Sequence, residues 1–350
     1  MAQTPPTTPP VIYRWDLDKT YLRTEFDTLR DLLRTAFEPA TRKQTVLGAS
    51  ALFRELRATQ PAGMHILSGS PEQMRPAIES KLRLDGIRWD RLTLKPSLQR
   101  LLRGQWRFLR DQVGYKLGAL LDARSVAPAN ALEVLFGDDA ESDAFVYSLY
   151  ADLLAHRVEV DTLLDVLRRV RTRQDDALRL VQVWQQLPRH NAVRRIFIHL
   201  DRVSSPRRFR PLGWRVCPFF NYFQPAVVLA DDGLLSAEAA LRVGAELVID
   251  GALGVDALNA SYADLQRRGF VSHAGRRQLH QALERLTLEP FAAAAPALAA
   301  LRRALDPAEA ATPRAHSQAF HPDHDYAQLL RDDRIWARRA KERALRGRSS

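Results

Sequence analysis

Two aspartates separated by one residue, Asp16 and Asp18, follow a short apolar run that begins at Val11. Side chains two apart on a continuing strand point to the same face, and a tight loop after Asp16 would also bring both carboxylates to one pocket. Phosphoryl transfer needs a nucleophile and an acid that protonates the leaving oxygen, so Asp16 and Asp18 are candidates for these roles. Thr20 would hold the turn by a hydrogen bond. The alternative is a solvated turn, where Asp and Thr are common.

A second polar segment, Ser68-Gly69-Ser70-Pro71, follows the apolar run 63–67. A hydroxyl at a strand end, followed by the N-terminus of a helix, can hold a phosphate, because the hydroxyl and the free backbone N–H groups both donate to its oxygens. Ser68 and Gly69 are therefore candidate phosphate-binding residues. Pro71 suits the first turn of the helix that follows. The alternative is an ordinary helix N-cap formed by Ser70.

A basic residue and an acidic segment come later in the chain. Lys116, on the expected helix before the strand 131–136, would neutralise the charge of a nucleophile and a phosphate, and Lys95 is the alternative for this role. Acids clustered directly after that strand would repel one another without a cation, and Mg²⁺ prefers such oxygen ligands. The alternative is an acidic helix N-terminus favoured by the helix dipole. The acids of this cluster are Asp138, Asp139, Glu141 and Asp143.

Strands and helices alternate over the first two thirds of the chain, and polar or glycine residues cluster where the strands end. This pattern predicts an α/β fold with a doubly wound parallel sheet, which binds ligands beyond the carboxyl ends of its strands, and a helical C-terminal extension. The expected strands are 11–16, 63–67, 91–94, 131–136, 195–200 and 215–222. The expected divisions are a disordered lead-in at 1–10, an α/β domain at 11–233 with a helical insertion near 150–190, a helical extension at 234–305, a linker at 306–325 and a basic tail at 326–350.

Taken in order, these segments resemble the four motifs of the haloacid dehalogenase-like superfamily. The stretches 32–37, 47–48 and 67–71 are similar to the catalytic domain of the actin-patch-associated phosphatidate phosphatases and their bacterial relatives. The last motif of that domain is Gly-Asp-Ser-Gly-Glu-x-Asp, and here residues 137–143 are Gly-Asp-Asp-Ala-Glu-Ser-Asp. The resemblance covers residues 11–230 and extends to the strand Arg-Ile-Phe-Ile-His-Leu-Asp at 195–201.

The resemblance implies a Mg²⁺-dependent phosphomonoester hydrolase that forms an aspartyl-phosphate, with phosphatidate as one candidate substrate. It implies that Asp16 is the nucleophile and a metal ligand, and that Asp18 is the acid and base with its backbone carbonyl as a second ligand. Ser68 and Lys116 would hold the phosphate. Asp138 would bind Mg²⁺, with Asp143 or Asp139 in support.

The composition limits location and partners. The single cysteine, Cys217, cannot form an internal disulfide. No apolar stretch approaches the roughly 20 residues of a membrane span, and residues 1–10 lack the features of a secretory signal. A cytoplasmic location is therefore expected. Of the net charge of +11, residues 334–350 carry +6, so the rest of the chain is only mildly basic.

The expected partner is a phosphorylated small molecule or lipid head group, with peripheral contact between the basic tail and an anionic membrane. Nucleic acid is the weaker alternative. An alternative function is a non-catalytic binding protein on a phosphatase fold, held by the tail to nucleic acid or an anionic membrane. The presence of both Asp16 and Asp18 argues against this alternative.

Two other clusters have simpler explanations. Three histidines lie near two aspartates between Pro313 and Asp325, but the segment is expected to be an unstructured linker rather than a metal site. Aromatic residues at 214–223 follow three arginines at 207–210. Such a mixture can stack on nucleic-acid bases or lie at a lipid interface, but we expect a buried strand beside a surface loop. The histidines are His316, His321 and His324.

Overall fold

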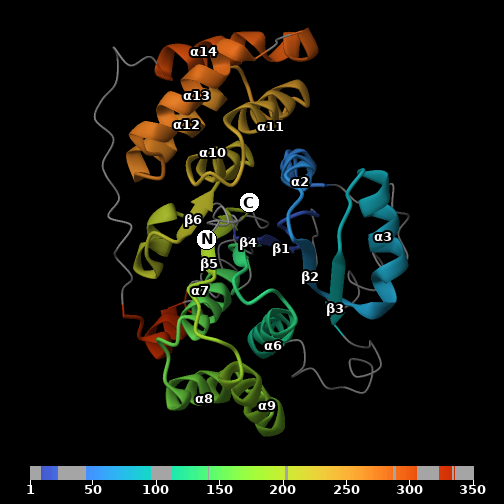
Figure 1. The fold of residues 1–350 in the computed structure, drawn as a ribbon, viewed down its shortest axis with the longest axis vertical. Coiled ribbons are helices and arrows are strands. Elements are labelled where there is room, and N and C mark those ends of the chain that lie inside the picture. The colour runs from blue at the N-terminus through green and yellow to red at the C-terminus, as the bar shows by residue number, and fades with distance from the viewer. Residues whose placement is uncertain are drawn as a thin grey trace, which may run out of the picture.

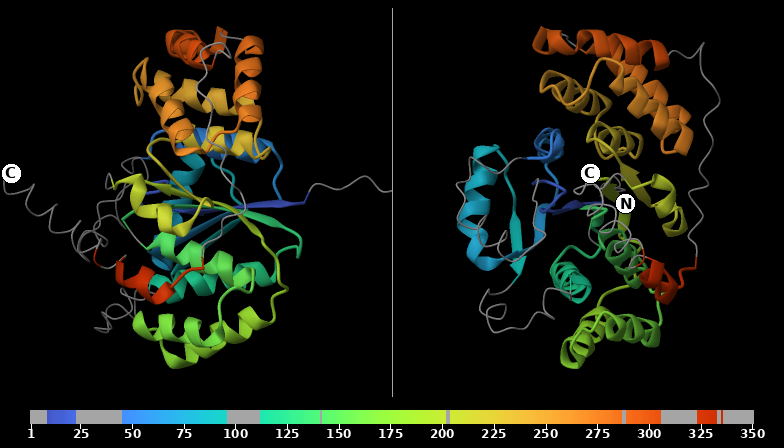
Figure 2. Two further views of the ribbon diagram at one scale, coloured as in Figure 1. Left: turned by 90° about the vertical axis from the view of Figure 1, so that its left-hand side faces the viewer. Right: turned by 180° about the vertical axis from the view of Figure 1, so that it is seen from behind.

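The computed structural model describes residues 9–22, 45–95, 112–140, 142–201, 204–286, 289–305, 323–332 and 335. Within these residues, six strands form one parallel sheet with helices on both faces (Figure 1). The left panel of Figure 2 shows the sheet nearly edge-on between its two helical layers. An α/β fold with a parallel sheet is therefore confirmed.

The strands follow the order β3-β2-β1-β4-β5-β6 across the sheet. The chain moves outward from β1 to β3 and then returns to the other side of β1, so the direction of the strand order reverses between β1 and β4. In open parallel sheets, a crevice for ligands lies beyond the strand ends at such a point. The strands are β1 (Val11–Asp16), β2 (Gly63–Pro71), β3 (Arg91–Lys95), β4 (Leu132–Asp138), β5 (Val193–His199) and β6 (Val216–Phe219).

The strand ends that differ most from the sequence-based expectation are those of β2 and β6. β2 continues to Pro71, so Pro71 closes a strand and does not open a helix. The last strand was expected to reach residue 222 but ends at Phe219, because the backbone then turns: the Phe220 amide donates to the side-chain oxygen of Gln224 at 2.8 Å.

One face of the sheet is covered by the early helices α2 and α3 and by the helices α10 to α14. Strand alternation directs Tyr13 and Trp15 of β1 to this side, where they join one continuous apolar core that reaches Leu301 and Leu305 of the last helix. The helices are α2 (Ala49–Ala58), α3 (Arg75–Leu84), α10 (Phe223–Asp231), α11 (Ala237–Ile249), α12 (Ala257–Arg268), α13 (His273–Arg285) and α14 (Ala295–Leu305). Short 3₁₀ helices are η2 (Glu72–Met74), η3 (Pro206–Leu212) and η4 (Glu289–Ala294).

Among the described residues, four α-helices that lie below the sheet in Figure 1 cover most of the second face, together with η3 and the helical residues 326–332. In the helix Val160–Arg169, Leu163, Val166 and Leu167 are buried at the i, i+3, i+4 spacing of an amphipathic helix. The four are α6 (Gln112–Ser125), α7 (Asp143–Leu154), α8 (Val160–Arg169) and α9 (Gln174–Gln185).

A buried ionic network lies between the sheet and this second layer. Arg14 of β1 donates two hydrogen bonds to Glu133 of β4, at 2.8 and 2.7 Å. Arg124 of α6 approaches the same carboxylate at 3.5 Å, and the hydroxyl of Tyr150 of α7 donates to it at 2.9 Å. Burial opposes ionisation of Glu133, but the arginine charges and these hydrogen bonds outweigh it and lower its pKa. The network joins β1, β4, α6 and α7.

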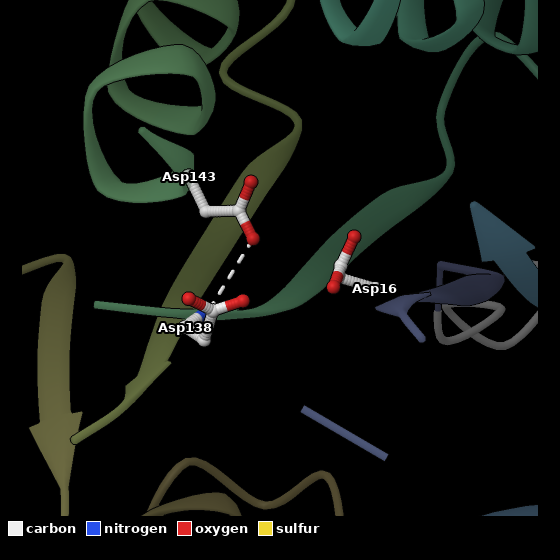
Figure 3. Close-up of side chains that lie close together, drawn as sticks. All are labelled: Asp16, Asp138 and Asp143. Carbon is white, nitrogen blue, oxygen red and sulfur yellow. Dashed lines mark hydrogen bonds between the residues drawn. The ribbon is translucent and has the colours of Figure 1, made fainter. Parts of the chain in front are cut away.

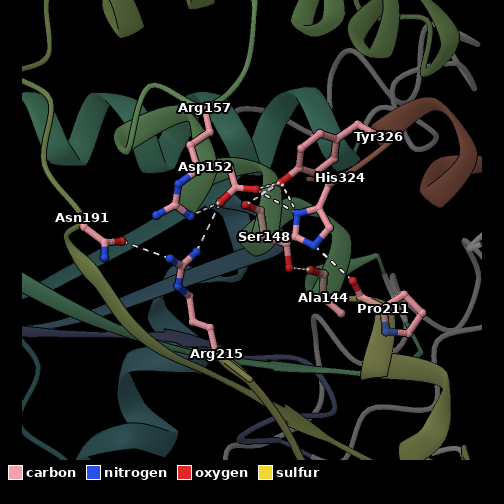
Figure 4. A network of polar contacts seen from close by, with 9 residues as sticks. All are labelled: Ala144, Ser148, Asp152, Arg157, Asn191, Pro211, Arg215, His324 and Tyr326. Carbon is pink, nitrogen blue, oxygen red and sulfur yellow. Dashed lines mark hydrogen bonds and ion pairs between the residues drawn. The ribbon is translucent and has the colours of Figure 1, made fainter. Parts of the chain in front are cut away.

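The helical residues 326–332 pack against α7 through a second polar network (Figure 4). Asp152 of α7 accepts a hydrogen bond from the Tyr326 hydroxyl at 2.6 Å, and its other contacts include His324 Nδ1 at 2.9 Å and Arg215 at 3.4 Å. Sequence reasoning placed His324 in a linker; in the structure it is fixed between Asp152 and the carbonyl of Pro211, which lies 3.2 Å from its Nε2 atom. His316, His321 and residues 333–334 and 336–350 of the basic tail lie outside the described residues.

The ionic network predicts a large cost for removing Glu133. In Glu133→Gln, the buried Arg14 keeps its charge and loses its partner, so we expect unfolding to become easier by about 3–5 kcal/mol. Urea denaturation measures this change. The control is Glu246→Gln, which breaks the exposed pair with Arg54 and should cost less than about 1 kcal/mol. Equal, small effects of the two substitutions would contradict a structural role for the network.

A second prediction concerns pH. Burial, followed by the charges of Arg14 and Arg91, lowers the pKa of His65 to about 4. Neutral Nδ1 accepts a hydrogen bond from Arg14, and protonation removes that acceptor. The folded pKa lies below the unfolded value of about 6.5, so the stability that His65 contributes is complete above that value and is lost as pH falls toward 4.

The measurement is the urea midpoint across this range of pH. His65→Gln keeps an acceptor but does not titrate, so its stability should fall less over the same window, by on the order of 1–2 kcal/mol given that the ring is partly exposed. Parallel curves for the two proteins would show that His65 is not the responsible group.

Candidate active site

The carboxyl ends of adjacent strands bring together residues that are far apart in the sequence. Asp16 is the last residue of β1, and Asp138 is the last residue of β4. Ser68 lies in the neighbouring strand β2, beyond the pairing of Asp16 with Leu67. These positions lie at the edge where the strand order reverses. A candidate site therefore occupies the place where an open parallel sheet binds its ligands.

Three buried carboxylates form the centre of the site (Figure 3). Asp16, Asp138 and Asp143 each offer an oxygen, and these oxygens lie within 4.8 Å of one another. All three residues are fully buried. Asp143 is the first residue of α7, and its carboxylate accepts a hydrogen bond from the Asp138 amide at 3.3 Å. The sequence left Asp139 and Asp143 as alternatives in this position; in the structure Asp143 joins the cluster, whereas Asp139 accepts from the Ser204 amide at 3.1 Å.

Lys116 of α6 lies against this cluster. Its Nζ atom is 2.9 Å from Asp16 Oδ1 and 2.5 Å from Asp143 Oδ1, and the residue is 1% exposed. The lysine and the three aspartates together have a formal charge of −2 when ionised. Like charges held together away from water are costly, and a divalent cation with oxygen ligands would offset them. The donor set therefore fits a hard cation such as Mg²⁺.

Nearby tyrosines are affected by the same negative charge. Burial is the main cause that raises the pKa of Tyr147 well above its usual value, and the Asp143 carboxylate raises it further. Burial and then Asp138 act in the same direction on Tyr222. Both phenols therefore stay protonated and can donate hydrogen bonds: Tyr147 to the carbonyl of Phe136, and Tyr222 to the carbonyl of Thr20.

Asp18 is held on the other side of the site by two hydroxyls. One of its oxygens, Oδ2, accepts from Ser68 Oγ at 2.9 Å and from Ser70 Oγ at 3.1 Å. The alternative in which Ser70 caps a helix is wrong, because Ser70 lies in β2 and α3 begins only at residue 75, without a side-chain cap. For Ser68 to donate to a phosphate, its hydroxyl has to rotate away from Asp18.

The loop that carries Asp18 and Thr20 is fixed by its backbone. Lys19 has a φ of 59°, and its carbonyl lies 2.9 Å from His199 Nδ1 at the end of β5. Thr20 is fully buried, and its hydroxyl has no hydrogen-bond partner within the described residues. A buried hydroxyl in this position can donate to a bound anion. A Cβ atom at Gly69 would meet nothing within 4 Å, so the space beside that predicted phosphate-binding residue is open.

The two lysines that competed in the sequence have different surroundings. Lys116 forms the ion pair with Asp16. Lys95, at the end of β3, places its ammonium 5.3 Å from the ring centroid of Tyr115, whose hydroxyl donates to the Ser68 carbonyl at 3.1 Å. Lys95 thus contacts a ring that is hydrogen-bonded to β2, and Lys116 contacts the carboxylates.

Sequence reasoning missed two residues of the site. Ser70 lies two residues after Ser68, and strand periodicity could have placed both hydroxyls on one face. Gly137 carries no polar group, but a Cβ atom there would lie 2.5 Å from Asp143 Oδ2 and 2.8 Å from the Tyr147 ring. A glycine before Asp138 is therefore what lets α7 bring Asp143 to the centre.

The aromatic residues near the end of the sheet are mostly internal. Phe219, Tyr222 and Phe223 are fully buried, and only Phe220 of this group is largely exposed, at 44%. The expectation of burial is confirmed for these residues, but only Phe219 lies in the strand, because β6 ends there and α10 begins at Phe223. None of the helices in the described part of the chain combines the length and apolar composition required to cross a bilayer.

A comparison with protein families supports an enzymatic reading of the site. Residues 15–161 match the model of the catalytic domain of phosphatidate phosphatase APP1. No curated protein and no solved structure matches the chain. The matched range ends before β5 and contains all the residues predicted above for the site. Over that range the chain is similar to a phosphatidate phosphatase-type catalytic domain, as the sequence motifs indicated.

The carboxylate cluster predicts a change in stability that can be measured without any turnover. We expect Mg²⁺ to raise the melting temperature of the wild-type protein by several degrees, because a ligand at 100 times its Kd stabilises the folded state by about 2.7 kcal/mol. Asp138→Asn removes one of the clustered charges, so its melting temperature in chelator should equal or exceed that of the wild type, and Mg²⁺ should no longer raise it.

Asp250→Asn, at an exposed position after α11, is the matched control and should respond to Mg²⁺ as the wild type does. A Mg²⁺-dependent rise that persists in Asp138→Asn would place the cation elsewhere.

Proposed function

We propose that this protein is a Mg²⁺-dependent phosphomonoester hydrolase of the haloacid dehalogenase-like type, with phosphatidate or a related lipid phosphate as a candidate substrate. The observation that carries the proposal is the buried group of Asp16, Asp138, Asp143 and Lys116 at the carboxyl ends of adjacent strands. The family match over residues 15–161 supports the substrate class. The strand order supports a doubly wound sheet.

In this proposal, Asp16, Asp138 and Asp143 hold the metal ion, together with the backbone carbonyl of Asp18. When bound, Mg²⁺ supplies positive charge that offsets the negative charge on the phosphoryl oxygens. Lys116 supplies a fixed second positive charge and orients Asp16 through its ion pair. The hydroxyls of Ser68 and Thr20 donate to the phosphoryl oxygens, and Gly69 leaves space for them.

The reaction proceeds in two steps. In the first, an Asp16 oxygen forms a bond to phosphorus while the bond from phosphorus to the leaving oxygen breaks, and Asp18 gives its proton to that oxygen. In the second, Asp18 takes a proton from a water molecule as the water oxygen attacks phosphorus, and the bond to Asp16 breaks. Inorganic phosphate leaves, and both aspartates return to their starting states. Ser70 holds the Asp18 side chain in position through its hydroxyl.

The nucleophile is tested by Asp16→Asn. The amide cannot attack phosphorus, so turnover of an aryl phosphate in Mg²⁺ should fall by about 10³-fold or more while the fold is retained. The wild-type protein, quenched in acid during turnover, should carry a phosphoryl group on the peptide that contains Asp16, detected by mass spectrometry.

Asp139→Asn is the matched control, because Asp139 is a buried neighbour that bonds the Ser204 amide and lies outside the proposed metal group. It should lose far less activity than Asp16→Asn. Wild-type turnover by Asp16→Asn would refute the assignment of the nucleophile.

A further inference from the structure

A cavity of about 490 Å³ opens between the first turn of α7, η3 and the C-terminal helical residues. Its walls are mainly apolar, and Phe145, Leu212, Leu329 and Ile335 contribute to them. Arg207, Arg208 and Asp332 line the same cavity, so its two positive charges outnumber its one negative charge. A volume of this size, with apolar walls and a few charged groups, is typical of small-molecule sites.

The C-terminal wall of the cavity is held in place by the polar network around Asp152 (Figure 4). The Tyr326 hydroxyl donates to Asp152 and to the Ser148 carbonyl, at 2.6 and 3.0 Å, and its ring packs edge-on against Phe145 with centroids 5.9 Å apart. Leu330 is buried in the same core, one helical turn after Tyr326. Because the contacts of Tyr326 and Leu330 hold this helical segment against α7, Leu329 is kept in the cavity wall.

Two of the residues that line the cavity lie beside the segment that carries Asp138 and Asp143. Ala144, which lines it, directly follows Asp143. Arg208 also lines it, and its Nη1 atom lies 3.5 Å from the carbonyl of Asp139, in the loop between Asp138 and Asp143. The cavity therefore has a basic side next to the catalytic loop and an apolar side formed in part by Leu329 and Ile335. Ile335 is 48% exposed, so part of its surface remains for a ligand to cover.

We propose that this cavity binds the alkyl or acyl portion of an amphipathic phosphomonoester whose phosphate is at the Asp16 centre. The inference rests on the proposed function and extends it, because it names the residues that select the substrate. Apolar walls favour a hydrocarbon chain through the hydrophobic effect, and the two arginines favour an anionic amphiphile over a neutral one. Leu329 and Ile335 thus determine specificity without touching the reacting atoms.

The test uses the full-length protein, a series of alkylphosphonates of increasing chain length, and two substrates, dioctanoyl phosphatidate and 4-nitrophenyl phosphate. Affinity for the phosphonates should rise by about fourfold for each methylene that the cavity buries. In Ile335→Glu this rise should be lost, and the ratio of kcat/KM for dioctanoyl phosphatidate to that for 4-nitrophenyl phosphate should fall by about tenfold. Leu329→Glu should act in the same way.

Leu178→Glu, at an exposed leucine of α9, is the control and should keep the wild-type ratio. Affinity that does not depend on chain length in the wild type, or an unchanged ratio in Ile335→Glu, would overturn the inference even if both substrates are hydrolysed. Chain-length-dependent binding that Ile335→Glu abolishes supports the cavity even if the wild type hydrolyses neither substrate, and in that case the proposed function fails alone.

Discussion

The buried ammonium group of Lys116 is held in place by contacts that involve several elements of the fold. Lys116 must lie between carboxylates from two other elements while being almost completely removed from water, and such a charge is stable only with well-placed partners. Four elements, β1, β4, α6 and α7, position Lys116 and its partners. The buried ionic network around Glu133 joins the same four elements, farther from the carboxylate cluster. Each of the four supplies one residue to the network and one to the site: Arg14 and Asp16 from β1, Glu133 and Asp138 from β4, Arg124 and Lys116 from α6, Tyr150 and Asp143 from α7. On the two helices, the paired residues are about two turns apart and therefore share a face.

The opposite face of the sheet supports the same centre by packing. Trp15 precedes Asp16 and stacks on Phe136 with ring centroids 4.0 Å apart, and Tyr222 stacks on Trp15 with centroids 5.8 Å apart. Phe136 lies two residues before Asp138, so the stack joins the strands that supply two of the carboxylates. Aromatic contacts of this kind resist relative sliding of adjacent strands. The sheet edge that carries the carboxylates is thus fixed by charge on one side of the sheet and by aromatic rings on the other.

Much of this arrangement could be predicted from the sequence, for physical reasons. β1 has the expected bounds, because a continuous apolar run that ends in an acid is characteristic of a buried strand with its polar end at the sheet edge. Asp16 and Asp138 come together because the ends of parallel strands share an edge. The choice between Asp139 and Asp143 was not predictable, since it depends on where α7 begins and on the close approach that Gly137 permits. The stretch 32–37, which contributes to the resemblance, lies outside the described residues.

Contacts between distant parts of the chain could not be predicted from the sequence either. His324 contacts Asp152, which lies 172 positions earlier in the chain, and no local sequence pattern near either residue indicates that contact. Charged residues inside the apolar strands, such as Arg14 and Glu133, can be assigned a partner only when the register of β1 and β4 is known.

The docking of residues 326–332 on α7 has a consequence for how the molecule is made. A polypeptide leaves the ribosome N-terminus first, and its early segments can fold while later ones are still being synthesised. Every proposed ligand of the metal ion precedes residue 144, whereas the cavity beside it lacks a wall until Tyr326 and Leu329 have been synthesised and have packed against α7. The proposed reaction centre therefore precedes the proposed substrate cavity in the order of synthesis, and a nascent chain halted before residue 326 would contain the first without the C-terminal wall of the second.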